Sequence, residues 1–277
     1  MAITILHTPH LPPAIRDGIT EIIPGELEPA DGFYRLHHQQ PVSAERLRGL
    51  RRQFRFDINP VPPGFESAAV RLLVSDMDST LITIECVDEI ADFAGVKSQV
   101  AAVTEAAMRG ELDFAESLRQ RVALLEGLDE AVLERVYEER LRLNPGAERL
   151  MEGLQQRGIH TALVSGGFTF FTDRLQRRLG LDFTLANRLS LRNGRLTGGV
   201  EGAIVGAEAK REFLLERCEE LEISPRQAIA VGDGANDLAM MQVAGLSVAF
   251  RAKPRVQERA DVVLDHSGLD AILHFVD

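Results

Sequence analysis

The sequence predicts a doubly wound α/β fold with a parallel sheet, an inserted helical cap and a small N-terminal module. Three observations lead to the parallel sheet. Short apolar runs rich in Val, Leu, Ile and Ala recur along the chain, as is typical of strands buried on both faces. Helical patterns lie between several of these runs. Two of those patterns end at Gly158 and Gly180, where a glycine cap is expected.

The predicted strands and helices alternate along most of the chain. We expect strands at 70–75, 161–165, 228–232, 246–250 and 260–264, and helices at 146–157, 168–178, 210–221 and 237–244. A hairpin is also expected, with arms at 183–191 and 196–205. Its turn contains Asn193-Gly194, which is a strong signal for a two-residue connection between antiparallel strands.

A long helical segment separates the first predicted strand from the next. Residues 84–144 show helical patterns and no strand-like run. An insertion at the carboxyl end of a strand is where a lid over a ligand crevice belongs. We therefore expect a helical cap at 84–144 and an α/β core formed by 69–83 and 145–277.

The first 68 residues differ in composition from the rest, because they hold nine of the twelve prolines. We expect residues 1–68 to form a small N-terminal module that ends in a Pro-rich linker. A capped helix is expected at 43–52 and a strand at 54–58. The linker is placed at 59–64, because Asn-Pro-Val-Pro-Pro-Gly can form neither a helix nor a central strand.

The charge of the chain argues against some classes of partner. It has 42 acidic and 31 basic side chains, and its formal net charge is −11. Sequence-independent binding of nucleic acid requires a basic surface, and so does binding to an anionic membrane. We therefore expect a small-molecule substrate, no nucleic acid and no membrane. An anionic substrate would need local positive groups or a metal ion to overcome the overall charge.

Cysteine usage and hydropathy indicate a cytoplasmic protein. Cys86 and Cys218 are not spaced as a pair of metal ligands and are expected to be reduced thiols. No run of about 18 apolar residues predicts a transmembrane helix. The first residues lack the basic start and long apolar core of a signal peptide. The sequence leaves the oligomeric state open, a homodimer included.

Two acidic motifs follow predicted strands. Asp76 and Asp78 come directly after the first strand, and Asp233, Asn236 and Asp237 follow a later one. Strand ends in an open α/β sheet face the ligand crevice. Two strands that deliver carboxylates to one crevice suit the hard oxygen ligation of Mg²⁺. Each motif alone is also compatible with a polar turn, or with a loop in which Asn236 or Asp237 caps the next helix.

A serine and a lysine extend the predicted site. Ser165 and Gly166 follow a predicted strand and open the next helix. A hydroxyl and free backbone N–H groups at a helix start can bind an anion, although a plain N-cap has the same pattern. Lys210 lies at the start of a predicted helix, where the helix dipole disfavours a cation. This misfit favours a ligand role for Lys210, although a lone lysine is usually just solvated.

Taken together, the motifs resemble those of the haloacid dehalogenase superfamily of phosphohydrolases. The order DMDST, VSGG, a lysine and GDGAND matches this superfamily from about residue 70 to 264. Within it, Glu85, the segment LDFAESLRQRVALLEGL and the hairpin motifs ANRL and NGRLTGGVEG resemble the phosphoserine phosphatases. The resemblance implies a Rossmann-like core with a cap, and it leaves out residues 1–68.

The resemblance also implies an activity and its catalytic groups. The reaction would be Mg²⁺-dependent hydrolysis of O-phospho-L-serine through an aspartyl-phosphate, which is the last step of serine biosynthesis. Asp76 would be the nucleophile, and Asp78 would act first as an acid and then as a base. Mg²⁺ would be held by Asp76, the backbone carbonyl of Asp78 and Asp233. Asp237 would support the metal site.

The same resemblance assigns the residues that bind the phosphoryl group. Ser165, the Gly166 amide and Lys210 would hold the phosphoryl oxygens, and Asn236 would also contact the substrate. These assignments are physically sensible, because a carboxylate attacks a phosphate dianion only when their repulsion is removed. A fixed lysine and a metal ion would do so.

The predicted cap offers an independent clue to the substrate. Four residues of the helix expected at 113–126 share one face: Phe114, Leu118, Arg121 and Leu125. A guanidinium on this apolar face needs an anion, which is either an acid of the cap or a substrate carboxylate. Glu85 would bind an ammonium group, unless it only stabilises a helix N-terminus. The two charges together match an amino-acid zwitterion.

Other functions are weighed against this one. The nearest is the same chemistry on phosphohomoserine or phosphoethanolamine, although phosphoethanolamine offers no carboxylate to Arg121. A receiver-type signalling module also forms an aspartyl-phosphate, but it has no place for the GDGAND loop or the cap. An inactive regulatory protein is disfavoured, because all the expected catalytic residues are present.

Overall fold

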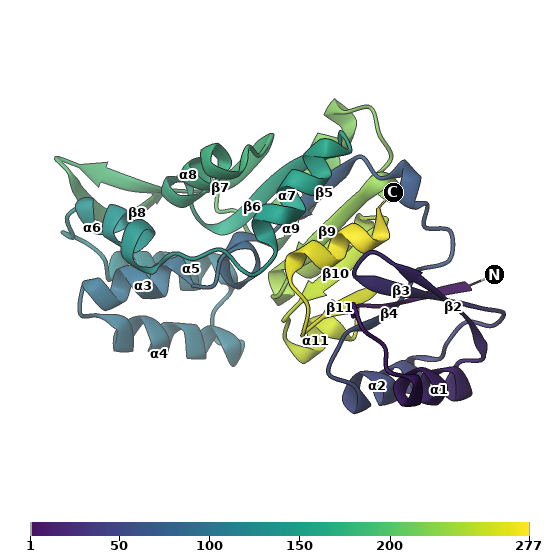
Figure 1. Ribbon diagram of the computed structural model, residues 1–277. Coiled ribbons are helices and arrows are strands. Elements are labelled where there is room, and N and C mark those ends of the chain that lie inside the picture. Colours follow the sequence, from purple (N-terminus) through teal and green to yellow (C-terminus); the bar gives the residue numbers. More distant parts are fainter. Residues whose placement is uncertain (1, 277) are drawn as a thin grey trace.

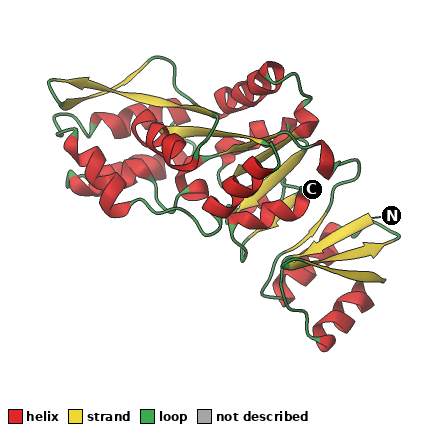
Figure 2. Ribbon diagram, turned by 45° about the horizontal axis from the view of Figure 1, so that its top comes forward, coloured by secondary structure: helices red, strands yellow, loops and turns green. Residues whose placement is uncertain are grey.

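The structure is a computed structural model that describes residues 2–276. Its strands form two sheets in different parts of the molecule (Figure 1, Figure 2). The N-terminal sheet contains β1 (Ala2–Leu6), β2 (Gly25–Ala30), β3 (Phe33–His38) and β4 (Ile58–Pro60). The larger sheet contains β5 (Leu72–Ser75), β6 (His160–Phe168), β7 (Phe183–Arg192), β8 (Arg195–Glu201), β9 (Ala228–Gly232), β10 (Leu246–Phe250) and β11 (Val262–Leu264).

The larger sheet confirms the doubly wound α/β prediction. Its order is β11-β10-β9-β5-β6-β7-β8, so the chain enters at β5 and fills the sheet on both sides of it. Neighbouring strands are parallel except β7 and β8. Alternate residues of β5 and β9 pack on opposite faces, one face against α7 and α8 and the other against α9 and α10. The helices of this part are α7 (Ala147–Gln156), α8 (Thr169–Leu179), α9 (Ala207–Glu220), α10 (Leu238–Val243) and α11 (Pro254–Gln257).

The residues between β5 and α7 are helical, and the hairpin packs against them. These helices are α3 (Cys86–Phe93), α4 (Lys97–Met108), α5 (Phe114–Ala123) and α6 (Ala131–Arg135), followed by one wide helical turn at Val136–Arg140. Asn193 and Gly194 have positive φ, as the predicted two-residue turn requires. The Gly127 N–H donates to the Leu196 carbonyl, and the Leu196 N–H donates to the Leu128 carbonyl. The hairpin therefore contacts the cap through these backbone hydrogen bonds.

The N-terminal sheet and its two helices form a split βαβ arrangement. The strand order is β2-β3-β1-β4, all pairs are antiparallel, and α1 (Pro13–Ile22) and α2 (Ala44–Gln53) share one core with the sheet. The strand predicted at 54–58 is wrong, because β4 begins at Ile58 and runs into the predicted linker. Pro60 is tolerated there because β4 is an edge strand of its own sheet, where a missing N–H is harmless.

Two buried polar side chains fasten the N-terminal module to the larger sheet. Asn59 of β4 accepts the Val263 N–H at 2.8 Å and donates to the Val263 carbonyl at 2.9 Å. Asp57 accepts N–H bonds at 2.8–3.2 Å from three successive residues after β11, namely Asp265, His266 and Ser267. Asp57 is 4% exposed and Asn59 is fully buried. The module is therefore docked on β11 as well as tethered by the chain.

We expect Asp57→Ala to destabilise the protein without removing any group from the candidate active site. The change leaves three backbone N–H groups without their acceptor, which costs about 2–3 kcal/mol in the free energy of unfolding. Urea or thermal unfolding measures this loss. Asp17→Ala removes an exposed carboxylate of α1 and is the control, which we expect to unfold like the parent protein. An Asp57→Ala protein as stable as the parent would show that this carboxylate does not hold the module.

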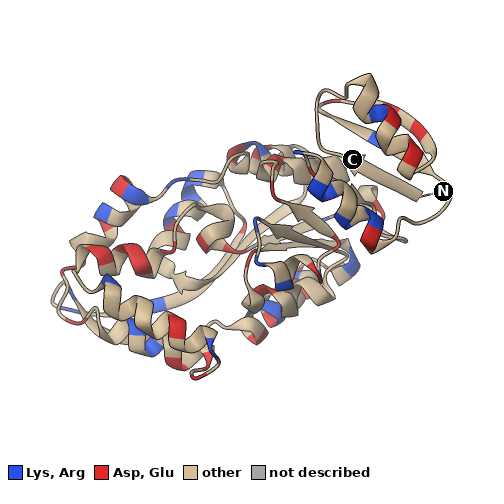
Figure 3. Cartoon of the chain, turned by 90° about the horizontal axis from the view of Figure 1, so that it is seen from below, with Lys and Arg blue, Asp and Glu red and all other residues tan. Residues whose placement is uncertain are grey.

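Charged residues of both signs are mixed along the surface helices. Figure 3 shows basic and acidic positions interspersed on the helices in that view. Some form ion pairs, such as Arg135 with Glu139 at 3.0 Å, and each such exposed pair contributes little stability. Between residues 2 and 276, no helix combines the length and the apolar character needed to cross a membrane.

Candidate active site

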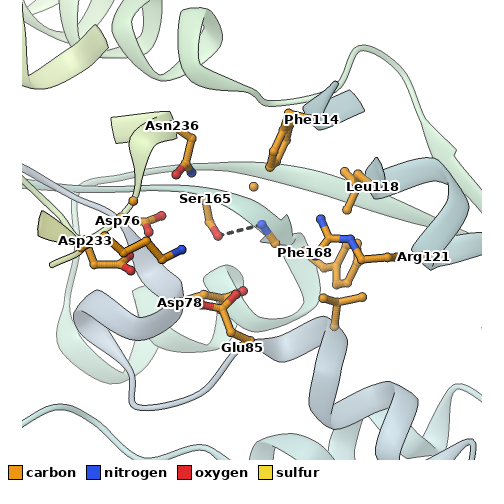
Figure 4. A pocket seen from close by; sticks show the side chains of 15 residues that line it. Asp76, Asp78, Glu85, Phe114, Leu118, Arg121, Ser165, Phe168, Asp233 and Asn236 are labelled. Carbon is orange, nitrogen blue, oxygen red and sulfur yellow. Dashed lines mark hydrogen bonds between the residues drawn. The ribbon is translucent and has the colours of Figure 1, made fainter. Parts of the chain in front are cut away.

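A cavity of about 130 Å³ lies between the carboxyl ends of β5, β6 and β9 and the cap (Figure 4). In Figure 4, Asp76 and Asp233 lie at one end of the cavity, and Leu118 and Arg121 lie at the other. Eight of the ten residues nominated from the sequence line it: Asp76, Asp78, Glu85, Arg121, Ser165, Gly166, Asp233 and Asn236. The other two, Lys210 and Asp237, are buried behind Asp76.

Lys210 is fully buried and links two aspartates. Its ammonium donates to Asp76 Oδ1 at 2.5 Å and to Asp237 Oδ1 at 2.7 Å. Burial lowers the pKa of Lys210, but the charges of Asp237 and Asp76 outweigh this effect and raise the pKa above its usual range. Burial, and then repulsion from Asp237, raises the pKa of Asp76 well above its usual range. Lys210 is therefore a fixed internal cation, and the alternative of a solvated lysine is wrong.

Three carboxylates at this end of the cavity can hold a metal ion. One oxygen each of Asp76, Asp233 and Asp237 lies within 4.8 Å of the others. Burial, and then repulsion from Asp237, raises the pKa of Asp233 to about 6. Within residues 2–276, Lys210 is the only ammonium in ion-pair contact with the three carboxylates. The excess negative charge and the all-oxygen donor set therefore fit a hard divalent cation.

The loop after β9 turns Asp237 back toward the strand. Asp237 Oδ2 accepts the Gly234 N–H at 3.0 Å. A Cβ at position 232 would lie only 2.4 Å from the Asp237 carboxylate, so glycine is required there. Asp237 occupies the predicted N-cap position of α10, but its side chain makes no capping hydrogen bond to that helix. Asp237 faces Lys210 instead, and Asn236 lines the cavity.

Asp78 lies on the cavity wall in an environment that favours its protonated form. Its Oδ2 accepts the Cys86 N–H at 3.3 Å, whereas its Oδ1 is buried with no hydrogen-bond partner in the part of the chain that is described. Burial, and then repulsion from Glu85, raises the pKa of Asp78 to about 7. A carboxyl group with this pKa can both donate and accept a proton near neutral pH.

Ser165 and Gly166 lie on extended backbone, so the prediction that they open a helix is wrong. β6 continues beyond them, and α8 begins only after it ends. The register between β6 and β7 shifts over this stretch, where Asn187 donates to the Gly166 carbonyl at 2.8 Å. Ser165 Oγ accepts the Gly167 N–H at 2.8 Å. A Cβ on Gly166 would lie 2.6 Å from the ring of Phe114, so the cap closes directly over this residue.

Arg121 reaches the cavity from α5, and it has no ion-pair partner among residues 2–276. Its Nε donates to the Ser117 carbonyl at 3.3 Å. No carboxylate oxygen of residues 2–276 lies within 4.0 Å of its guanidinium. Burial lowers the pKa of Arg121, while the more distant charges of Asp88, Glu85 and Asp78 oppose this effect. The alternative of a salt bridge within the cap is therefore wrong, and the guanidinium is free to bind an anion in the cavity.

Glu85 lies at the rim of the cavity and directly precedes α3. Its Oε1 accepts a hydrogen bond from Ser79 Oγ at 2.6 Å. Its side chain makes no capping hydrogen bond to α3. The carboxylate is thus near both the helix start and the cavity, and binding of an ammonium group by Glu85 stays a prediction.

Seven lining residues were not predicted as site residues: Val87, Phe114, Leu118, Gly167, Phe168, Gly234 and Lys253. Of these, Phe114 and Leu118 were predicted only to share the helix face of Arg121. Lys253 could have been predicted to lie near the cavity, because it follows β10 at the same edge of the sheet as Asp76 and Asp233. Its N–H donates to the Asp233 carbonyl at 3.2 Å, and its charge acts to lower the pKa of Asp233. Val87 and Phe168 are ordinary apolar residues in their local patterns, so only the fold shows that they face the cavity.

Comparison with known proteins shows the family of the chain. Residues 70–245 match the family model of haloacid dehalogenase-like hydrolases. The chain belongs to this family. Over 224 residues, this hydrolase is 57% identical to a phosphoserine phosphatase of Polaromonas sp. (strain JS666 / ATCC BAA-500). That alignment covers 79% of this chain and 95% of the relative.

Solved structures extend the likeness of this hydrolase to the whole chain. A haloacid dehalogenase family hydrolase from Salmonella enterica subsp. enterica serovar Typhi superposes with a TM-score of 0.91 at 32% identity and covers 100% of this chain and 98% of its own. The N-terminal module is therefore part of the shared architecture. A phospho-aspartyl intermediate analogue of a phosphoserine phosphatase superposes with a TM-score of 0.70 at 41% identity, covering 75% of this chain and 99% of its own.

Proposed function

We propose that this hydrolase is a Mg²⁺-dependent phosphoserine phosphatase that hydrolyses O-phospho-L-serine to serine and phosphate, the last step of serine biosynthesis. The observation that carries the proposal is one cavity with two unlike ends. Asp76, with the Lys210 ammonium directly behind it, lies at the end suited to phosphoryl transfer. Arg121, which has no ion-pair partner within residues 2–276, lies at the end suited to a carboxylate. The name of the 57%-identical relative supports the same substrate. The two buried free cysteines suit the cytoplasm.

The proposed reaction has two steps. Asp76 attacks the phosphorus atom, the bond from phosphorus to the serine oxygen breaks, and protonated Asp78 gives its proton to that oxygen. The Asp78 carboxylate then takes a proton from a water molecule, which attacks the phosphoryl group on Asp76 and releases phosphate. A pKa of about 7 for Asp78 suits both roles. The phospho-aspartyl analogue of a relative supports the covalent step.

The residues around Asp76 remove the repulsion between a carboxylate and a phosphate. We assign Mg²⁺ to Asp76, Asp233 and the backbone carbonyl of Asp78, with Asp237 in support. When bound, the ion neutralises negative charge on the phosphoryl oxygens. Lys210 uses two of its three N–H groups on Asp76 and Asp237, which leaves one for a phosphoryl oxygen.

The remaining contacts orient the substrate. Ser165 and the Gly166 N–H donate to the phosphoryl oxygens, and Asn236 contacts the substrate beside them. Arg121 binds the carboxylate and Glu85 binds the ammonium group. The position of each of these residues on the cavity wall supports its assignment. Oriented donors of this kind accelerate phosphoryl transfer, which depends mostly on positioning and on charge stabilisation.

A panel of phosphomonoesters assayed with and without Mg²⁺ tests the proposal. We expect the highest kcat/KM for O-phospho-L-serine, a lower value for phosphohomoserine, and the lowest for phosphoethanolamine, which has no carboxylate for Arg121. Treatment with EDTA is expected to lower turnover by at least about 100-fold, and added Mg²⁺ to restore it. Equal rates on phosphoserine and phosphoethanolamine would contradict the proposal that phosphoserine is the substrate. Full activity in EDTA would contradict the metal requirement.

A further inference from the structure

Ser79 has an unusual backbone conformation beside the catalytic aspartates. Its φ and ψ are 58° and −4°, in the left-handed region that residues other than glycine rarely adopt. Ser79 directly follows Asp78, which lines the cavity. In the described chain, three other non-glycine residues have positive φ, at 193, 222 and 251, and none of them is adjacent in sequence to a lining residue. Residues held in such conformations cluster at functional sites, where the strain places a group that function requires.

The conformation of Ser79 places its hydroxyl against Glu85. Ser79 Oγ donates to Glu85 Oε1 at 2.6 Å, and this is the one hydrogen bond that the Glu85 side chain makes to residues 2–276. The loop between them is closed by the Ser79 N–H, which donates to the Ile84 carbonyl at 3.2 Å. Glu85 is exposed, so without this bond its flexible side chain would sample several rotamers in solvent. Figure 4 shows the Glu85 side chain directed toward Asp78 and the cavity.

We propose that Ser79 is a positioning residue for substrate selection, whose hydroxyl holds the Glu85 carboxylate in the orientation that binds the ammonium group of the substrate. The proposal rests on the proposed function, because the ammonium belongs to an amino-acid phosphomonoester. Ser79 occupies Oε1, which leaves Oε2 to accept from the ammonium. A carboxylate oriented before binding loses less conformational freedom on binding, so its contact with the substrate is stronger.

A purely structural role for Ser79 would require only that the residue at position 79 can adopt a positive φ. If only the turn mattered, glycine would serve at least as well as serine, because glycine adopts positive φ without strain. Ser79→Gly keeps the turn and removes the hydroxyl, so this variant separates the two roles. Ser79→Ala is less informative, because it removes the hydroxyl and keeps the strain.

The test compares two substrates that differ only in the ammonium group: O-phospho-L-serine and its deamino analogue, both assayed with Mg²⁺. We expect Ser79→Gly to lower the ratio of their kcat/KM values about tenfold, mainly through a higher KM for phosphoserine. Thr83→Ala removes an exposed hydroxyl from the same loop and is the matched control. It is expected to leave the ratio unchanged. In a Glu85→Gln background, adding Ser79→Gly is expected to lower the ratio no further, because the two residues act as one unit.

Two results would overturn the positioning role. One is an unchanged ratio in Ser79→Gly, and the other is an equal drop in the presence and absence of Glu85. If the proposed function itself were incorrect, the unmodified protein would already reveal it. That protein would then hydrolyse the deamino analogue as well as it hydrolyses phosphoserine, and the positioning role would fall with it.

Discussion

Asp76→Asn is expected to abolish turnover while leaving the fold intact. An amide is a poor nucleophile, so the covalent step is lost and kcat falls on the order of 10³-fold or more. Asparagine keeps the shape of the side chain, and Lys210 keeps its bond to Asp237 at 2.7 Å. The change also removes a buried carboxylate that Asp237 repels. Steady-state kinetics and an unfolding curve measure the two effects separately.

The label that remains on the enzyme identifies the nucleophile. Acid quench of the parent protein during turnover of ³²P-labelled phosphoserine should leave phosphate on Asp76, and Asp76→Asn should retain none. Asp173→Asn changes an exposed aspartate of α8 in the same way and is expected to keep both activity and label. Label on a serine or a histidine of the parent protein would end the aspartyl-phosphate mechanism.

Arg121→Ala is expected to cost about 2–5 kcal/mol in kcat/KM for phosphoserine, which is the range seen when one partner of a desolvated charge pair is removed. The guanidinium faces the cavity and, within residues 2–276, has no carboxylate partner. Under the proposed function, the variant loses the contact between Arg121 and the substrate carboxylate. An aryl phosphate offers no carboxylate, so the loss on that substrate should be much smaller. Parallel kcat/KM measurements on the two substrates give the difference.

Arg119 provides the matched control for Arg121. It lies on the same helix and is exposed, so Arg119→Ala removes an equal charge outside the cavity. We expect this variant to resemble the parent protein on both substrates. If Arg121→Ala instead lowered kcat/KM equally for phosphoserine and for the aryl phosphate, Arg121 would stabilise the cap and would not select the substrate.

The placement of the acidic residues was predictable because it depends on local sequence. Asp76 and Asp78 follow a buried apolar strand, and Asp233 follows another, so the parallel sheet brings all three to one edge. The periodicity of α5 predicted that Arg121 shares the face of Phe114 and Leu118, and all three line the cavity. The extended backbone conformation of Ser165 was not predictable in this way, because a serine and two glycines after a strand suit a helix cap and a strand extension equally.

The alternation of strands and helices, the hairpin turn and the strand ends that carry the carboxylates could all be predicted from the amino-acid sequence. These features depend on periodicity and backbone preference over a few residues. Other contacts become visible only in the folded chain: Lys210 binds Asp76, which is 134 positions away, and Asn59 binds Val263, which is 204 positions away. The fold also shows that Arg121 has no ion-pair partner within the described chain and that Ser79 donates a hydrogen bond to Glu85. These contacts arise from desolvation, because a buried polar group must pair with whichever partner the packing brings within reach, and the local sequence does not contain that partner.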